Sequence, residues 1–179
     1  MLSEDNISEE SVQYEESVTN SENTYDDLTI DSDFTLNESK KVNNLTISNG
    51  TLNLNGYDIT VYGNVILTQD GKLNCSRGEI VCNNFTMNSR SYLYMTNAND
   101  HIVVNGNFVH NGGYFYSTNA TAGTIEIKGN FTSKTSNFNP NTEHKIIFNG
   151  TEKQTISLNG SSSTFNILEI NNTSKEGVF

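Results

Sequence analysis

The chain of 179 residues contains no tryptophan, a single proline and only two cysteines. Its hydrophobic content of 34% is low for a compact globule, so a deep spherical core is not expected. No apolar run approaches the ~18 residues of a membrane-spanning helix, and the N-terminus lacks the basic-then-apolar pattern of a signal peptide. Lysine and arginine are scattered, which leaves binding to nucleic acid without electrostatic support. These absences argue against a membrane span and against a nucleic-acid partner.

The negative charge of the chain is concentrated at one end. Residues 1–33 contain eleven acidic residues and no lysine or arginine, whereas residues 34–179 contain ten acidic and ten basic residues. Low hydrophobicity combined with like charge predicts a disordered acidic linker over residues 1–27. We expect one folded domain over residues 28–179. Because its last coil is irregular and Lys175–Phe179 resembles an interrupted strand, we expect flanking domains of a longer protein.

A four-residue corner returns four times in this domain, each time between two β-type runs. The strands that follow the corners, together with the strand at Leu45, begin 20, 20, 23 and 23 residues apart. A period of this size is typical of a stacked repeat, in which each coil buries its apolar face against its neighbours. The corners are Tyr62-Gly63-Asn64-Val65, Cys82-Asn83-Asn84-Phe85, Asn105-Gly106-Asn107-Phe108 and Lys128-Gly129-Asn130-Phe131.

Each repeat contains three short β-type runs, which predicts an all-β, three-walled parallel β-helix of about six coils of 20–23 residues. We expect a right-handed helix, because parallel crossovers almost always are right-handed. The Gly-Asn pairs are expected to supply left-handed backbone at the corners. The third runs are expected to centre on Val61, Val81, Val104, Ile127 and Phe148. The predicted inward residues are Leu52 and Leu54, Val65 and Leu67, Phe85 and Met87, Ile102 and Val104, and Ile125 and Ile127.

Several stretches resemble the β-solenoid repeats of large bacterial cell-surface or secreted adhesin-like proteins. The resemblance covers roughly residues 28–179 and implies a structural or adhesive role, an extracellular or cell-surface location and no catalytic motif. The stretches are Asn53-Leu54-Asn55-Gly56 with Val61-Tyr62-Gly63-Asn64, Ala122-Gly123-Thr124-Ile125-Glu126-Ile127-Lys128-Gly129-Asn130-Phe131, and Ile147-Phe148-Asn149-Gly150-Thr151-Glu152-Lys153-Gln154-Thr155-Ile156-Ser157.

Enzymes that cut acidic polysaccharides also use parallel β-helices, so a catalytic function must be considered. Glycoside hydrolysis needs two carboxylates facing one groove, and a lyase would need clustered aspartates for Ca²⁺ beside an Arg or Lys base. Neither Arg77 nor Arg90 has such neighbours. We therefore expect no enzyme activity and no cofactor; the alternative is a carbohydrate-binding module or an inactive relative of such an enzyme. The acidic residues of the repeats are expected to be isolated surface charges: Asp58, Asp70, Glu79, Asp100, Glu126 and Glu143.

The two cysteines and three histidines do not form a metal-binding pattern. Cys75 aligns with Leu54 and should point inward, whereas Cys82 aligns with the outward Tyr62, unless Ile80 shifts that strand by one residue. Free thiols are favoured over a disulfide. His101, His110 and His144 lie on different coils at non-equivalent positions.

The most distinctive feature of the repeats is aromatic. If Leu93 and Phe115 point inward, then Tyr92 and Tyr94 point outward from one coil and Tyr114 and Tyr116 from the next. This predicts a two-by-two patch with spacings of ~4.8 Å between coils and ~7 Å along each strand. Such rings suit a glycan or a protein ligand. The alternative is an aromatic ladder that only stiffens the sheet.

Overall fold

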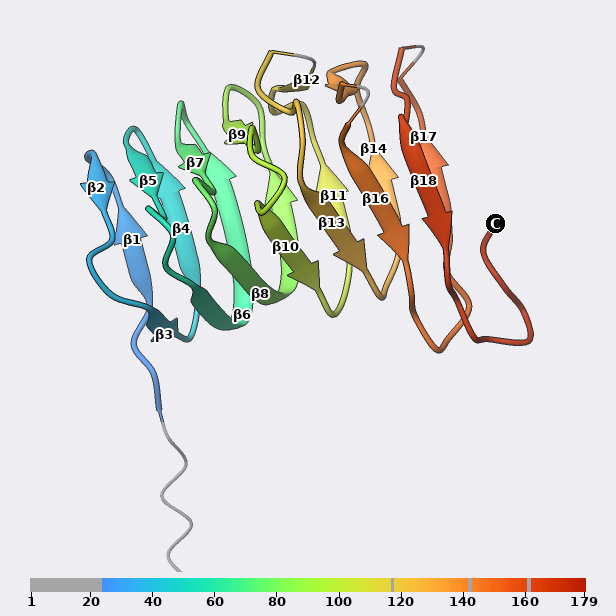
Figure 1. Cartoon of the computed structure of the whole chain (residues 1–179), viewed down its shortest axis with the longest axis horizontal. Coiled ribbons are helices and arrows are strands. Elements are labelled where there is room, and N and C mark those ends of the chain that lie inside the picture. The colour runs from blue at the N-terminus through green and yellow to red at the C-terminus, as the bar shows by residue number, and fades with distance from the viewer. Residues whose placement is uncertain (1–23, 117, 142, 161) are drawn as a thin grey trace, which may run out of the picture.

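The computed structural model describes residues 24–116, 118–141, 143–160 and 162–179, and these form a parallel β-solenoid of about seven turns (Figure 1). The sequence predicted this fold with about six coils. Most of the predicted linker, residues 1–23, lies outside the described residues. The described residues contain no helix, and so none long and apolar enough to cross a membrane. The handedness stays a prediction.

The strands form three walls, and neighbouring strands within each wall pair in parallel. The long strands β6 (Ile59–Thr68) and β8 (Glu79–Met87) run through a corner, from the third wall into the first. The first wall also contains β1 (Leu28–Ile30), β4 (Leu45–Ser48), β11 (Phe108–His110), β14 (Phe131–Ser133) and β17 (Ile156–Leu158). The second contains β2 (Phe34–Thr35), β5 (Thr51–Asn53), β7 (Lys72–Asn74), β9 (Tyr92–Tyr94), β12 (Phe115–Tyr116) and β15 (Phe138–Asn139). The third also contains β3 (Lys40–Val42), β10 (His101–Val104), β13 (Thr124–Ile127), β16 (Lys145–Phe148) and β18 (Ile167–Ile170).

The core is a continuous column inside these walls. All the predicted inward residues are fully buried, as the alternation of apolar and polar residues indicated. Equivalent residues stack in register, so that Phe85, Phe108 and Phe131 form one row with ring centroids 5.0 and 5.6 Å apart. Each coil therefore buries its apolar side chains mainly against the coils on either side.

The Gly-Asn corners differ from the prediction, because Gly106 and Asn107 do not have the left-handed backbone that was expected. Glycine is needed at position 106 because the preceding coil lies too close to leave room for a side chain. A Cβ atom on Gly106 would lie 2.5 Å from Asn84 Oδ1 and 2.7 Å from the carbonyl oxygen of Asn83. The backbone N–H of Asn107 donates to Asn84 Oδ1 at 2.9 Å, and that of Asn130 donates to Asn107 Oδ1 at 2.8 Å. An asparagine ladder thus ties consecutive corners together.

One strand has a different register from the one expected. Cys82, rather than Val81, pairs with Val61 and Val104, so the corner after Cys82 is one residue shorter than its neighbours. The alternative that Ile80 left open is therefore the one observed: Ile80 pairs with Ile59 and Ile102, and the side chain of Cys82 is fully buried rather than outward. Cys75 is buried as predicted, and both thiols are free. Burial raises the pKa of each thiol, that of Cys82 to about 12.

Candidate binding face

The second wall carries the four tyrosines on its outer surface. Tyr92 and Tyr94 flank the fully buried Leu93 on β9, and Tyr114 and Tyr116 flank the fully buried Phe115 on the next coil. All four tyrosines are half-buried. The strand alternation therefore brings them to one surface, which we call the tyrosine patch.

The rings of the patch contact one another closely. The centroids of Tyr92 and Tyr114 are 4.7 Å apart, close to the spacing of adjacent strands, and the two ring planes are tilted by 33°. Tyr92 lies 6.1 Å from Tyr94, and Tyr114 lies 5.6 Å from Tyr116 with the rings edge to face. Desolvation, followed by the neighbouring phenols and Asp70, raises the pKa of Tyr92. The patch is thus both an aromatic ladder and a surface of partly accessible rings.

An arginine lies at the edge of the tyrosine patch. Arg90 Nε is 3.1 Å from Asp70 Oδ1, and its guanidinium also pairs with Asp70 Oδ2. Both residues have positive φ, at 67°, in the corners that precede the second wall. The hydrogen bond and charge of Asp70, together with smaller effects of Tyr114 and Tyr92, raise the pKa of Arg90. A planar hydrogen-bond donor therefore lies beside the aromatic surface.

A polar groove of about 330 Å³ lies at the other end of β9. It adjoins the tyrosine patch because Asn74, in its lining, pairs in register with Tyr94. Its side chains offer amide, hydroxyl and guanidinium groups, which can donate and accept hydrogen bonds. The lining includes Asn55, Asn74, Ser76, Arg77, Thr96 and Asn97.

Asp100 anchors the backbone around this groove. Its side chain is buried, so the prediction that it is an isolated surface charge is wrong. One carboxylate oxygen accepts the N–H of Arg77 at 2.6 Å, and the other accepts those of Thr96 at 2.7 Å and Asn97 at 2.9 Å. Hydrogen bonds to a charged acceptor are strong, so this carboxylate holds two successive coils in fixed positions around the groove.

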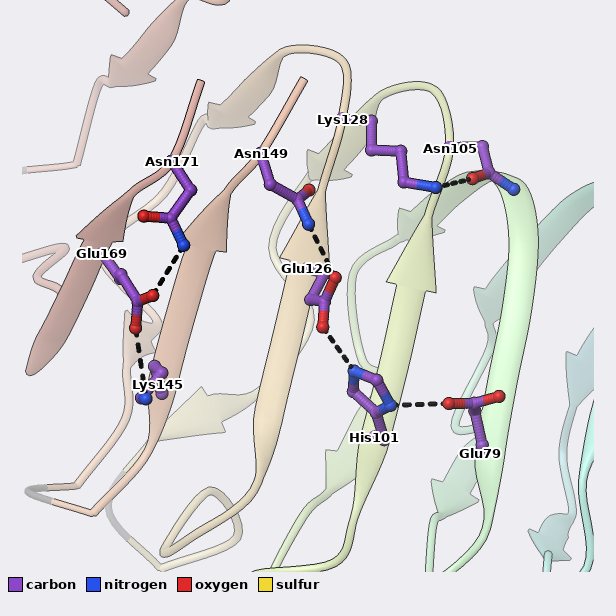
Figure 2. A network of polar contacts seen from close by, with 9 residues as sticks. All are labelled: Glu79, His101, Asn105, Glu126, Lys128, Lys145, Asn149, Glu169 and Asn171. Atoms are coloured by element: carbon purple, nitrogen blue, oxygen red, sulfur yellow. Dashed lines mark hydrogen bonds and ion pairs between the residues drawn. The ribbon is translucent and has the colours of Figure 1, made fainter. Parts of the chain in front are cut away.

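A second polar cluster lies on the outer face of the third wall (Figure 2). His101 Nδ1 is 2.6 Å from Glu79 Oε2, and His101 Nε2 is 3.1 Å from Glu126 Oε1. Glu126 also accepts a hydrogen bond from Asn149 at 2.7 Å. This cluster was not predicted from the sequence, because the expected alignment of Val81 with Val104 places Glu79 beside Ile102 rather than beside His101. The correct register could have been found from Ile80 and Cys82. If these two residues point inward, strand alternation makes Glu79 point outward.

Further contacts of the same kind join coils along this wall (Figure 2). Lys128 Nζ donates to Asn105 Oδ1 at 2.8 Å, and Lys145 Nζ lies 3.2 Å from Glu169 Oε2. The carboxylates are thus occupied by histidine, lysine and asparagine partners. Within the described part of the chain, no group of three or more His, Cys, Asp or Glu side chains could hold a metal ion.

The other two histidines belong to the interior. His110 Nε2 lies 2.6 Å from the carbonyl oxygen of Gly113, and its Nδ1 lies 2.9 Å from Ser133 Oγ. His144 packs edge to face on Phe115 at 4.9 Å, and neither of its ring nitrogens has a hydrogen-bond partner among the described residues. Burial lowers the pKa of both residues, that of His144 to about 4.

The chain matches no family model, no curated protein and no solved structure.

Proposed function

We propose that this chain is a non-catalytic structural and adhesive segment of a bacterial cell-surface or secreted protein. The observation that carries the proposal is the uninterrupted stack of coils. The core column, the phenylalanine row and the asparagine ladder each continue from coil to coil. Such a stack suits a stiff spacer, because every coil is fixed by both neighbours.

The outer surface supports the same proposal. On the third wall the carboxylates of Glu79, Glu126 and Glu169 are engaged in contacts between coils, rather than paired across an open groove as hydrolysis requires. On the second wall, the tyrosine patch offers rings with polar rims, a composition enriched where proteins contact partners. The partner on this wall would be a protein or a glycan of a neighbouring surface.

Cell-surface exposure tests the proposed location. Antibodies raised against the chain are expected to label intact cells of the source organism, or to detect the protein in culture medium before any lysis. A cytosolic protein, followed in parallel, must stay unlabelled for the measurement to be valid. Labelling that appears only after the cells are opened would contradict a surface or secreted role.

A carbohydrate-binding module is the second candidate, and the geometry beside β9 specifically favours it. The tyrosine patch continues into the polar groove, and the anchored backbone around Asp100 holds that groove in shape. Aromatic rings next to several amide and hydroxyl groups can bind a sugar by stacking and by hydrogen bonds.

A glycan array tests the carbohydrate-binding candidate. If the second is right, the chain binds a defined set of sugars, and Tyr92→Ala or Tyr114→Ala reduces that binding at least about tenfold, as loss of a central aromatic contact does. Tyr62→Ala is the matched control, because Tyr62 is exposed at a different corner, where it stacks on Tyr25. Binding that the control reduces equally, or no binding at all, would contradict the carbohydrate-binding candidate.

A further inference from the structure

Two cationic side chains lie beside the tyrosine patch and the polar groove. Lys72 begins β7 and pairs in register with Tyr92, so it lies next to the patch, whereas Arg77 follows β7 and lines the groove. Lys72 is half-buried and Arg77 is exposed. Among the described residues, neither side chain forms an ion pair. Both charges are therefore available to a ligand on this face.

The carboxylates of the same stretch already have partners. Asp70 pairs with the arginine at the edge of the patch, and Glu79 lies on the third wall, 2.6 Å from a ring nitrogen of His101. Asp100 is buried and accepts three backbone N–H groups. Residues 70–100 contain no other acid. The charge left uncompensated around the patch and the groove is thus positive, although the whole chain has a net charge of −11.

An acid on a more distant coil does not neutralise Lys72. Asp33 precedes β2 and lies two coils away along the same outward row. Its carboxylate accepts the backbone N–H of Thr51 at 2.8 Å. Hydrogen bonds of Thr51 and, to the smallest extent, the charge of Lys72 lower the pKa of Asp33. Asp33 therefore binds the corner beside it, and Lys72 stays open to other partners.

The remaining groups of this surface are neutral. Apart from Arg77, the groove is lined by amides, hydroxyls and one glycine, and such groups can both donate and accept hydrogen bonds with the hydroxyls of a sugar. The half-buried tyrosines beside them offer ring faces for stacking. Because the pKa of Tyr92 is raised, its phenol is uncharged at neutral pH and does not repel an anion.

We propose that the tyrosine patch and the polar groove bind an acidic glycan, with its sugar rings against the tyrosines and an anionic group on Arg77. This inference rests on the carbohydrate-binding candidate and names the class of glycan. The guanidinium of arginine is a planar fork that can pair with two oxygens of a carboxylate or of a sulfate ester. Lys72 supplies a second positive charge at the other end of β7, so a glycan with repeated acidic groups meets a cation at both ends of this strand.

Binding to matched acidic and neutral sugars tests the proposal. Oligosaccharides that carry glucuronate, sialic acid or sulfate are each compared with the same oligosaccharide after the acidic group has been reduced or removed. The acidic member of at least one pair should bind about tenfold more tightly or better, because hydrogen bonds to charged groups are the strong ones. The pair that shows this preference tells whether the anionic group is a carboxylate or a sulfate.

Arg77→Gln removes the charge from the groove and keeps the backbone N–H that Asp100 accepts, so the shape of the groove is retained. It should weaken binding of the acidic glycan about tenfold. Lys134→Gln is the matched control, because it removes the same charge from an exposed position directly after β14, on the first wall. This control should bind the acidic glycan as the unmodified chain does.

The outcomes separate this proposal from the candidate on which it rests. Equal binding of the acidic and neutral members would overturn the acidic preference and leave the carbohydrate-binding candidate standing, whereas binding to no glycan would overturn both. Unchanged binding in Arg77→Gln, or an equal loss in Lys134→Gln, would overturn the role of the groove. The comparison of matched sugars uses the unmodified chain and does not depend on how the variants fold.

Discussion

Replacing Phe108 with alanine is expected to lower the free energy of unfolding by about 3–5 kcal/mol, the usual cost of emptying a large buried site. Phe108 is fully buried in the middle of the stack. Its ring lies between Phe85 and Phe131, with centroid distances of 5.0 and 5.6 Å, and contacts Phe138 edge to face at 6.1 Å. The substitution therefore weakens the contacts of one coil with both neighbours. Denaturant titrations followed by circular dichroism measure the loss.

Phe34→Ala is the control for this prediction. Phe34 lies in the first coil, is 40% exposed and has a pairing partner on only one side, so its loss should cost clearly less. Equal losses in the two variants would contradict the view that the middle of the stack depends most on its neighbours. A nearly neutral Phe108→Ala would contradict the aromatic row itself.

Much of the architecture could be predicted because a solenoid repeats its local rules. The recurring corners set the period, and alternation within each strand set the inward side, as the burial of Leu52, Val65 and Phe108 shows. The error at Cys82 arose because both Val81 and Cys82 are apolar enough to face inward. Register there depends on which residue stacks on Val61, and this requires the neighbouring coil.

The corner glycines illustrate a second limit. A Gly-Asn pair commonly indicates left-handed backbone, but Gly106 is required by the approach of the preceding coil, which sequence alone does not show. The left-handed residues lie in other corners, for example at Asn55 and Arg77, where no single residue type marks them. Local propensity could not distinguish these two reasons for a sharp corner.

The candidate binding face was predictable in part. The tyrosine patch follows from strand alternation alone, because Leu93 and Phe115 fix which residues point outward. The polar groove depends on how the segments around Arg77 and Asn97 fold, and these corners vary in length between coils. Asp100, which orders both segments, looks in the sequence like any surface aspartate. Its role became visible only from its burial and its three backbone donors.

Acid is expected to destabilise the fold through His144, by about 3 kcal/mol between pH 6.5 and pH 4. The ring is fully buried without a hydrogen-bond partner among the described residues, and desolvation lowers its pKa from 6.5 to about 4. Above pH 6.5 the ring is neutral in both the folded and the unfolded chain, so the stability is unaffected. Between the two pKa values only the unfolded chain binds the proton, so stability falls as the pH falls. The pKa values of the unfolded and folded chain differ by about 2.5, and about 1.4 kcal/mol for each tenfold change in proton affinity sets the size of the effect.

His144→Leu isolates this contribution, because it removes the titrating group and keeps an apolar side chain against Phe115. Denaturant titrations of both proteins at several pH values should show a much shallower slope between pH 6.5 and pH 4 for the variant. His110, whose lowered pKa acts in the same direction, is present in both proteins and cancels in the comparison. The carboxylates with lowered pKa values, Asp27, Asp33 and Glu169, affect the stability mainly at more acidic pH and cancel likewise. Identical slopes in this window would show that His144 does not stay neutral in the folded chain.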